Sequence, residues 1–243
     1  MPITSRYEKN IEKGGITPEI QEKLRQTSVI VMGAGGLGSG VIMNLSALGV
    51  GRIKIIDNDI VQETDLNRQL IHKYSDIGRA KVLSARDWIH DFNPDIKIEI
   101  EKLKLYELNY LNIIQGYDII IDCFNSPEAD YLLNNIALRH KKILIYGHTE
   151  GFSGQVTTIY PPETGCLACV LQKPKLYIKE KTATISPIIS VVSSLMAQEI
   201  LKIVGEIGEP LLNKFLMYDG LKSEFKIVNY HKNPHCEICS GVF

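Results

Sequence analysis

Short uninterrupted apolar runs alternate with helix-periodic segments through the first 150 residues of the chain. A fully apolar run is typical of a parallel strand buried on both faces, and apolar residues three and four positions apart are typical of a helix. The predicted strands are Ser28–Met32, Arg52–Ile56, Ile96–Ile100, Asp118–Cys123 and Ile143–Gly147. The predicted helices are Pro18–Arg25, Leu37–Leu48, Gly78–Phe92 and Pro127–His140. This alternation predicts an α/β fold with a Rossmann-like, doubly wound and mostly parallel sheet.

The pattern changes after residue 150. The segments Gln155–Tyr160, Lys214–Tyr218 and Glu224–Tyr230 alternate between apolar and polar residues, and Asp219-Gly220 is typical of a turn between the last two. We therefore expect antiparallel strands that extend the parallel sheet.

One long apolar segment and one charged segment lie between these strands. The stretch Ser186 to Gly205 contains Gln198, Glu199 and Lys202, so it predicts a buried helix over Ser186–Val204 rather than a membrane span. The segment Gln172–Thr182 is charged and has no periodicity, which is typical of a mobile loop.

Length and composition predict one ordinary globular domain over residues 1–243. We expect a polar arm (1–16), a half with alternating strands and helices (17–150) and a second half (151–243). The chain is 44% hydrophobic and 23% charged with a net charge of -1, which gives no reason to expect binding to nucleic acid or to a membrane. The polar start carries no apolar signal segment, so we expect a cytoplasmic protein.

A glycine-rich turn follows the first predicted strand. Gly33, Gly35 and Gly38 fit G-x-G-x-x-G between a strand and a helix, where backbone N–H groups and the helix N-terminus bind phosphates. Asp57 lies nineteen positions after Gly38, at the end of the second strand, where an acid accepts a hydrogen bond from a ribose. These features predict that residues 17–150 form a nucleotide-binding half, but they do not identify the nucleotide.

The segment after Asp57 is rich in phosphate-binding side chains. It offers Arg68, Gln69 and Lys81, with Asn67 and Asp65 beside them. Arginine binds phosphate oxygens in pairs and lysine neutralises them, so this set suits a triphosphate better than NAD. Surface charge alone is the alternative interpretation.

Four of the five cysteines form two C-x-x-C pairs, Cys166/Cys169 and Cys236/Cys239. Four thiolates make a closed, tetrahedral and therefore structural zinc site. The sixty-six residues between the pairs are too many for a compact zinc ribbon, so the metal would fasten the C-terminus to the domain. A redox dithiol is the alternative, and two matched pairs favour metal.

These motifs, in this order, resemble the ThiF/MoeB/HesA family, the bacterial relatives of ubiquitin-activating enzymes. The resemblance rests on GAGGLG, D-x-D-x-V-x6-RQ, G-R-A-K, a strand ending in Asp-Cys, and the two C-x-x-C pairs, from about Arg6 to Cys239. It implies an enzyme that uses ATP and Mg²⁺ to adenylate the C-terminal carboxylate of a small ubiquitin-like protein. It also implies a homodimer, and a carrier-binding role for residues 151–243.

The resemblance assigns roles to individual residues. Asp122 would hold Mg²⁺, and the end of a parallel strand is where such a carboxylate meets a ligand. Arg68 and Lys81 would neutralise the triphosphate, and Asp57 would hold the ribose. The full set of implied ATP-binding residues is Gly33, Gly35, Gly36, Gly38, Asp57, Asp59, Asn67, Arg68, Gln69 and Lys81.

The N-terminal Arg6-Tyr7-Glu8-Lys9-Asn10 resembles the family's R-Y-x-R-Q, whose second arginine reaches the partner subunit's triphosphate. Lys9 stands in its place and supplies charge without paired hydrogen bonds, and we expect Arg6 to share the role.

Two further motifs depart from the family pattern. N-L-x-R-Q begins here with Asp65, whose charge would repel phosphate unless it binds Mg²⁺ or points away. D-C-T-D-N reads Asp122-Cys123-Phe124-Asn125-Ser126, which alters the wall near the adenosine.

No cysteine is left for a covalent sulfur link. The loop after the first cysteine pair, Leu171 to Ser186, contains none, and Cys123 is interpreted as a small buried residue. We therefore expect adenylation without an enzyme thioester. His148 is interpreted as a structural histidine, with contact to the acceptor carboxylate as the alternative.

Four functions compete at this point. The first is adenylation of a sulfur carrier that ends in Gly-Gly. The second is adenylation of a ribosomal peptide in natural-product maturation. The third, an NAD-dependent oxidoreductase, leaves Arg68, Lys81 and the cysteine pairs unexplained. The fourth is a scaffold without turnover, for which the departures at Asp65 and Lys9 are the only indication.

Overall fold

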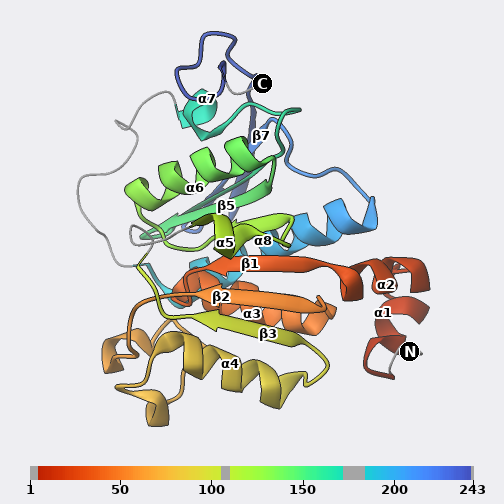
Figure 1. Ribbon diagram of the computed structural model, residues 1–243, viewed down its shortest axis with the longest axis vertical. Helices are drawn as coiled ribbons and strands as arrows, with labels where there is room; N and C mark the ends of the chain where they lie inside the picture. Colours follow the sequence, from red (N-terminus) through yellow and green to blue (C-terminus); the bar gives the residue numbers. More distant parts are fainter. Residues whose placement is uncertain (1–4, 105–109, 172–183, 242–243) are drawn as a thin grey trace.

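One eight-stranded sheet runs through the molecule in the order β3-β2-β1-β4-β5-β6-β7-β8 (Figure 1). The computed structural model describes residues 5–104, 110–171 and 184–241. The first five strands along the chain are parallel: β1 (Ser28–Met32), β2 (Arg52–Ile56), β3 (Lys97–Glu101), β4 (Ile119–Asp122) and β5 (Ile143–Glu150). Antiparallel strands complete the sheet: β6 (Ser153–Ile159), β7 (Lys214–Asp219) and β8 (Glu224–Asn229). The predicted mixed sheet is thus confirmed, while the predicted loop Gln172–Thr182 lies outside the described residues.

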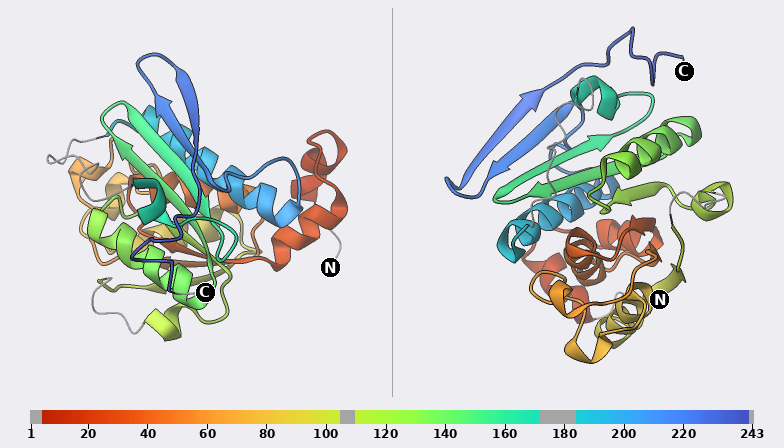
Figure 2. Two further views of the ribbon diagram at one scale, coloured as in Figure 1. Left: turned by 90° about the horizontal axis from the view of Figure 1, so that it is seen from above. Right: turned by 90° about the vertical axis from the view of Figure 1, so that its left-hand side faces the viewer.

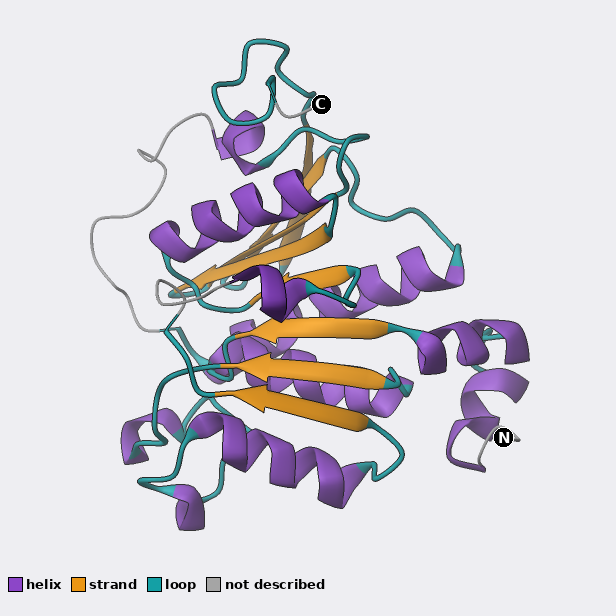
Figure 3. Ribbon diagram, in the orientation of Figure 1, coloured by secondary structure: helices purple, strands orange, loops and turns teal. Residues whose placement is uncertain are grey.

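Helices cover both faces of this sheet (Figures 2 and 3). One core packs beneath α2 (Pro18–Gln26), α3 (Gly36–Leu48), α4 (Lys81–Phe92) and α8 (Ser186–Gly205). The second core packs beneath α5 (Tyr110–Ile114), α6 (Pro127–His140) and α7 (Leu167–Leu171). Two short 3-10 turns, Glu63–Asp65 and Tyr74–Asp76, lie between β2 and α4.

The apolar helix α8 is a core helix. It is long and apolar enough to cross a membrane by length and composition. Its side chains Val192, Met196 and Ile200 are fully buried in the first core, against α3 and the sheet. The sequence predicted such a buried helix, because Gln198, Glu199 and Lys202 interrupt the apolar segment.

Helix α4 begins three residues later than the pattern predicted. Gly78 has φ +85°, which no right-handed helix contains. Ala80 has an extended backbone and forms an isolated bridge with Ile60. The helix therefore starts at Lys81. This start places the lysine in the first turn, beside the loop that follows β2.

The N-terminal arm is ordered into Ser5–Tyr7 and α1 (Glu8–Glu12), where the polar pattern had predicted only an arm. Tyr7 is buried, and its hydroxyl accepts a hydrogen bond of 2.8 Å from Asn93 Nδ2. Its ring packs on Gly49, which follows the C-terminus of α3. At about 1.5 Å per residue, the 13 residues of α3 separate this point from Gly36 by about 20 Å.

Candidate active site

A cavity of about 760 Å³ opens at the carboxyl ends of the parallel strands. Its wall includes Gly33 after β1, Asp57 after β2 and Phe124 after β4. In the strand order, connections leave β1 toward β2 and β3 on one side, while β4 and β5 lie on the other. Doubly wound sheets bind ligands at this switch point.

The glycine turn is shaped by close backbone approaches. Gly33 has φ +106°, and a Cβ there would lie 2.9 Å from Cys123 O. A Cβ on Gly38 would lie 1.9 Å from Gly33 O, so this glycine lets α3 begin directly against the strand end. Gly33, Gly35 and Gly36 line the cavity, whereas Gly38 serves the turn from behind it.

Asp57 is tied to the turn. Its Oδ2 accepts a hydrogen bond of 2.7 Å from Ala34 N, and its Oδ1 accepts one of 2.8 Å from Asp59 N. The carboxylate is therefore fixed at the cavity wall, where the sequence predicted an acid for the ribose. Asp59 also lines the cavity.

The predicted phosphate-binding cations converge on Asp65. Lys81 Nζ lies 3.5 Å from Asp65 Oδ2 and 3.6 Å from Asp59 Oδ2. Arg68 Nη2 lies 3.6 Å from Asp65 Oδ1. Arg68, Lys81, Gln69 and Asp65 all line the cavity, while the exposed Asn67 lies behind Arg68 and accepts a hydrogen bond of 2.9 Å from its Nη1.

The departure at Asp65 has a local structural role. Its Oδ2 accepts a hydrogen bond of 3.0 Å from Gln62 N, which caps the 3-10 turn, and its Oδ1 accepts one of 2.9 Å from Gln69 Nε2. Asp65 is buried, so its negative charge has Lys81 and Arg68 as its main counter-ions. Any phosphate bound by these cations shares them with this carboxylate.

Asp122 lies behind the cavity wall rather than on it. Its side chain is fully buried, and Oδ1 accepts a hydrogen bond of 3.2 Å from Phe124 N. Asp122 Oδ2 and both carboxyl oxygens of the buried Asp130 have no other donor among the described residues. Burial raises the pKa of both groups, and the neighbouring Asp122 raises that of Asp130 further, because the two can share a proton but cannot easily both be charged. The magnesium role predicted for Asp122 thus gains no support from this position.

Polar side chains from β5, the β4–α6 loop and the first turn of α6 form the other wall, and the sequence assigned roles to few of them. Asn125 has φ 54° and bonds both backbone groups of Thr149, at 3.1 and 3.0 Å, which fixes the β4–α6 loop to β5. Glu128, His148 and Glu150 also line the cavity. The alternation of residues along β5 was a usable signal for His148 and Glu150, but only the fold shows which face borders the cavity.

Two buried polar atoms at the cavity have no hydrogen-bond partner among the described residues, Gln69 Oε1 and His148 Nδ1. Most buried ring nitrogens in proteins are hydrogen-bonded, so Nδ1 of His148 has a place for a ligand contact. Burial lowers the pKa of His148, which favours the neutral ring. Both atoms are free to bond a ligand.

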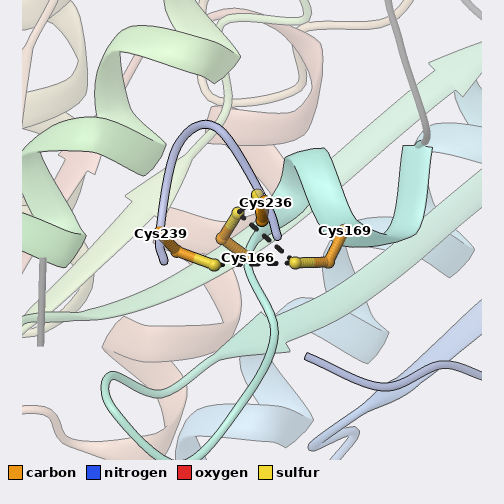
Figure 4. Close-up of side chains that lie close together, drawn as sticks. All are labelled: Cys166, Cys169, Cys236 and Cys239. Atoms are coloured by element: carbon orange, nitrogen blue, oxygen red, sulfur yellow. Dashed lines mark hydrogen bonds between the residues drawn. The ribbon is translucent and has the colours of Figure 1, made fainter. Parts of the chain in front are cut away.

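The four paired cysteines meet at the far end of the molecule from the N-terminal arm (Figures 1 and 4). Their sulfur atoms lie within 4.8 Å of one another, and the closest pairs are 3.6, 3.7 and 3.9 Å apart. Tetrahedral zinc with Zn–S bonds of about 2.3 Å requires sulfur atoms about 3.8 Å apart. The cluster joins α7 to the C-terminal segment and fits such an ion.

Comparison with known proteins identifies the family. A family model described as the ThiF family matches residues 7–238. The chain belongs to this family. Among ThiF-family relatives, the sulfur carrier protein adenylyltransferase of Thermus thermophilus is 34% identical over 96% of this chain and 90% of its own length. The molybdopterin-synthase adenylyltransferase of Salmonella typhimurium is 32% identical over 96% and 95%, and the SAMP-activating enzyme E1 of Haloferax volcanii 32% over 96% and 88%.

Solved structures agree with this assignment. Escherichia coli MccB, in a crystal structure with ATP, superposes with a TM-score of 0.87 at 26% identity, over 98% of this chain and 75% of MccB. MccB with MccA-N7isoASN gives a TM-score of 0.83. The family and the adenylyltransferase class predicted for this ThiF-family chain are therefore confirmed, and they replace the NAD-dependent alternative.

Proposed function

We propose that this ThiF-family chain adenylates the C-terminal carboxylate of a small ubiquitin-like sulfur-carrier protein with ATP and releases pyrophosphate. The observation that carries the proposal is the convergence of the glycine turn, Asp57, Lys81 and Arg68 on one cavity. The relatives named sulfur carrier protein adenylyltransferase and molybdopterin-synthase adenylyltransferase match this chain over 90% and 95% of their own length and support the proposal.

The chain's residues suit this reaction without a general base. A C-terminal carboxylate has a pKa of about 3.5 and is already ionised at neutral pH. Catalysis then requires alignment of the carboxylate with the α-phosphate and stabilisation of the charge that develops on the phosphates. The N-terminus of α3, Lys81 and Arg68 would supply that charge stabilisation.

We propose that Mg²⁺ takes part, bound by carboxylates on the cavity wall rather than by Asp122. Magnesium prefers one or two carboxylates together with phosphate oxygens. Asp59, Glu128 and Glu150 line the cavity and are candidates. The ion would neutralise phosphate charge.

For the cysteine cluster we propose structural zinc. The sulfur spacing supports it, and all four positions of the ion would be filled by protein. We also propose a cytoplasmic homodimer in which Arg6 and Lys9 act on the partner's cavity, because within one subunit they lie beyond the far end of α3.

The proposed carrier needs a protein-binding surface. All six residues of β8 are exposed, and the strand presents Phe225 (56% exposed) and Ile227 (53%) on the face where Phe225 stacks on Tyr218 of β7. Exposed apolar side chains along an unpaired edge strand are typical of a protein-binding site. We assign this edge to the carrier.

Adenylation of a short peptide is the second candidate, and the MccB structures with MccA favour it. The sulfur-carrier relatives are more similar in sequence, and a quarter of MccB lies outside its match to this chain. The acceptor therefore decides between the two.

ATP–pyrophosphate exchange tests the function. We expect exchange that depends on a carrier ending in Gly-Gly and is not supported by short peptides. Lys81→Ala and Arg68→Ala should each lower the exchange rate by about 100-fold, because a preorganised charge-stabilising group is lost. Arg86→Ala, an exposed arginine on the same helix as Lys81, is the control. Exchange with peptide alone would favour the second candidate, and undiminished exchange in both variants would refute the site.

A further inference from the structure

His72 lies in the loop between the two 3-10 turns, directly beneath the glycine turn, and is only 6% exposed. Its Nε2 is 2.9 Å from Ala34 O, and its Nδ1 is 2.8 Å from Ser84 Oγ. The Ser84 hydroxyl also lies 2.9 Å from Asp76 Oδ2. Neither the sequence motifs nor the proposed reaction assigns this histidine a role.

The direction of one of these hydrogen bonds is fixed by chemistry. A carbonyl oxygen only accepts, so His72 Nε2 carries the proton and donates it to Ala34 O. In the neutral ring, Nδ1 carries no proton. The single proton of the Ser84 hydroxyl then serves either Nδ1 or Asp76 Oδ2, which both lie within hydrogen-bond distance of Oγ. Burial lowers the pKa of His72 and favours this neutral form; the charge of Lys81 acts in the same direction, and Asp76 and Asp65 act against it.

The contact orients the glycine turn. A peptide unit is planar and trans, so the Ala34 carbonyl and the Gly35 N–H on the same unit point in opposite directions. The carbonyl is directed at the buried His72, so the Gly35 N–H is directed the other way, and Gly35 lines the cavity. The preceding Ala34 N–H is fixed as well, by Asp57 Oδ2 at 2.7 Å.

The same side chain reaches the helix that carries Lys81. Ser84 is one turn along α4 from Lys81 and is 2% exposed. The loop before His72 carries Arg68 and Gln69. One buried ring therefore connects the three segments that supply the phosphate-binding groups.

We propose that His72 is a positioning residue for ATP, which holds the Ala34 carbonyl so that the Gly35 N–H faces the triphosphate and connects the turn to α4 through Ser84. This inference rests on the proposed nucleotide-binding function. His72 itself does not touch the substrate.

Two variants of His72 separate the effect of its hydrogen bond to Ala34 O from the effect of filling the space of the ring. In His72→Gln the amide nitrogen takes about the place of Nε2 and can still donate to Ala34 O. In His72→Asn the amide nitrogen takes about the place of Nδ1 and stops short of Ala34. We expect His72→Asn to weaken binding of a non-hydrolysable ATP analogue by about ten-fold, because the turn loses a buried hydrogen bond that orients a donor. His72→Gln should stay within about three-fold of wild type. His90→Gln, an exposed histidine on α4, is the control and should bind as wild type does.

A second readout does not depend on nucleotide. Amide hydrogen exchange at residues 34–36 should be faster in His72→Asn than in His72→Gln at matched melting temperatures. In the wild-type protein, ¹⁵N spectra of the imidazole should show the ε2-protonated ring, and this holds whether or not the variants fold.

The outcomes are distinct. Equal analogue affinity and equal exchange in both variants, or a δ1-protonated ring in the wild type, would overturn the role of His72 alone. Failure of the wild type to bind the analogue would overturn the proposed function and this inference with it.

Discussion

At the residue scale, Asp65 helps to build the cavity wall and also reduces the positive charge of the cations proposed to bind phosphate. Asp65 caps its own turn and holds Gln69, so it belongs to the architecture of the cavity. The same carboxylate lies 3.5 Å from Lys81 and 3.6 Å from Arg68. The triphosphate would therefore meet cations that are already partly neutralised.

Replacing Asp65 with Asn tests that balance. The amide keeps an oxygen for the Gln62 N–H but removes the negative charge, so we expect ATP to bind about five-fold more tightly, as about 1 kcal/mol of repulsion is lost. Direct titration of ATP measures it, with the exposed Asp91→Asn as control. Weaker binding at an unchanged melting temperature would show that Asp65 instead orders the cations.

The buried pair Asp122 and Asp130 predicts a pH dependence of stability. The pKa of each carboxyl is raised above its unfolded value of about 4, so the folded protein holds more protons and the free energy of unfolding falls as pH rises from about 4 through the raised values. Asp130→Asn removes one charge and supplies an N–H donor. We expect a higher melting temperature at about pH 8 and a flatter profile down to about pH 5. Asp118→Asn, at an exposed site, should leave the profile unchanged, and an equally steep profile in Asp130→Asn would contradict the shared proton.

Cys123 leads to a prediction about the reaction. It is 5% exposed, and burial with the neighbouring Asp122 raises the pKa of its thiol, so little thiolate is present at neutral pH. We expect intact-mass measurements during turnover with a carrier to show free carrier, adenylate and unmodified enzyme. A stable carrier adduct lost in Cys123→Ala would contradict this.

At the scale of elements, two distant segments depend on each other. Around the four cysteines, α7 and the C-terminal segment share a small cluster in which Leu138 of α6 is the other buried apolar residue. So few apolar contacts contribute little free energy to holding the C-terminal segment against α7, and a bound metal ion would supply the remaining stabilisation.

Removal of one ligand tests the fastening. We expect Cys236→Ser to lose bound zinc, measured by mass spectrometry, and to lower the melting temperature by about 5–10 °C. Exchange activity per folded molecule at low temperature should stay within about two-fold, because the cluster is structural. Glu237→Gln, exposed between the two cysteines, is the control. Full stability without metal would refute the structural role.

At the scale of the whole molecule, the N-terminal arm lies on the opposite side from the carboxyl ends of β1 and β2 (Figure 1), where the cavity opens. Lys9 pairs with Glu12 at 3.7 Å, and Arg6 lies over the Phe92 ring at 5.7 Å, so neither reaches the cavity of its own subunit. A catalytic role for either residue requires a second subunit.

Mixed dimers test this arrangement. An Arg6→Ala, Lys9→Ala subunit keeps its cavity, and a Lys81→Ala subunit keeps its arm. Each variant alone should be nearly inactive, and co-expression should restore about one quarter of wild-type exchange, because half of the dimers are mixed and each has one complete site. Mixed dimers of confirmed size that recover no activity would exclude action across the interface.

The sequence by itself determined the layered fold, because apolar runs and helical periodicity report burial directly. It also determined the family, the nucleotide-binding turn and the four cysteines, since these depend on local spacing. Only the tertiary structure decided that Asp122 faces Asp130 instead of the cavity, that Asp65 holds both cations, and that His72 lies under Ala34. It also gave His148 and Glu150 their place on the wall. Such outcomes depend on which face of an element meets which neighbour, and that is set by packing between segments far apart in the chain.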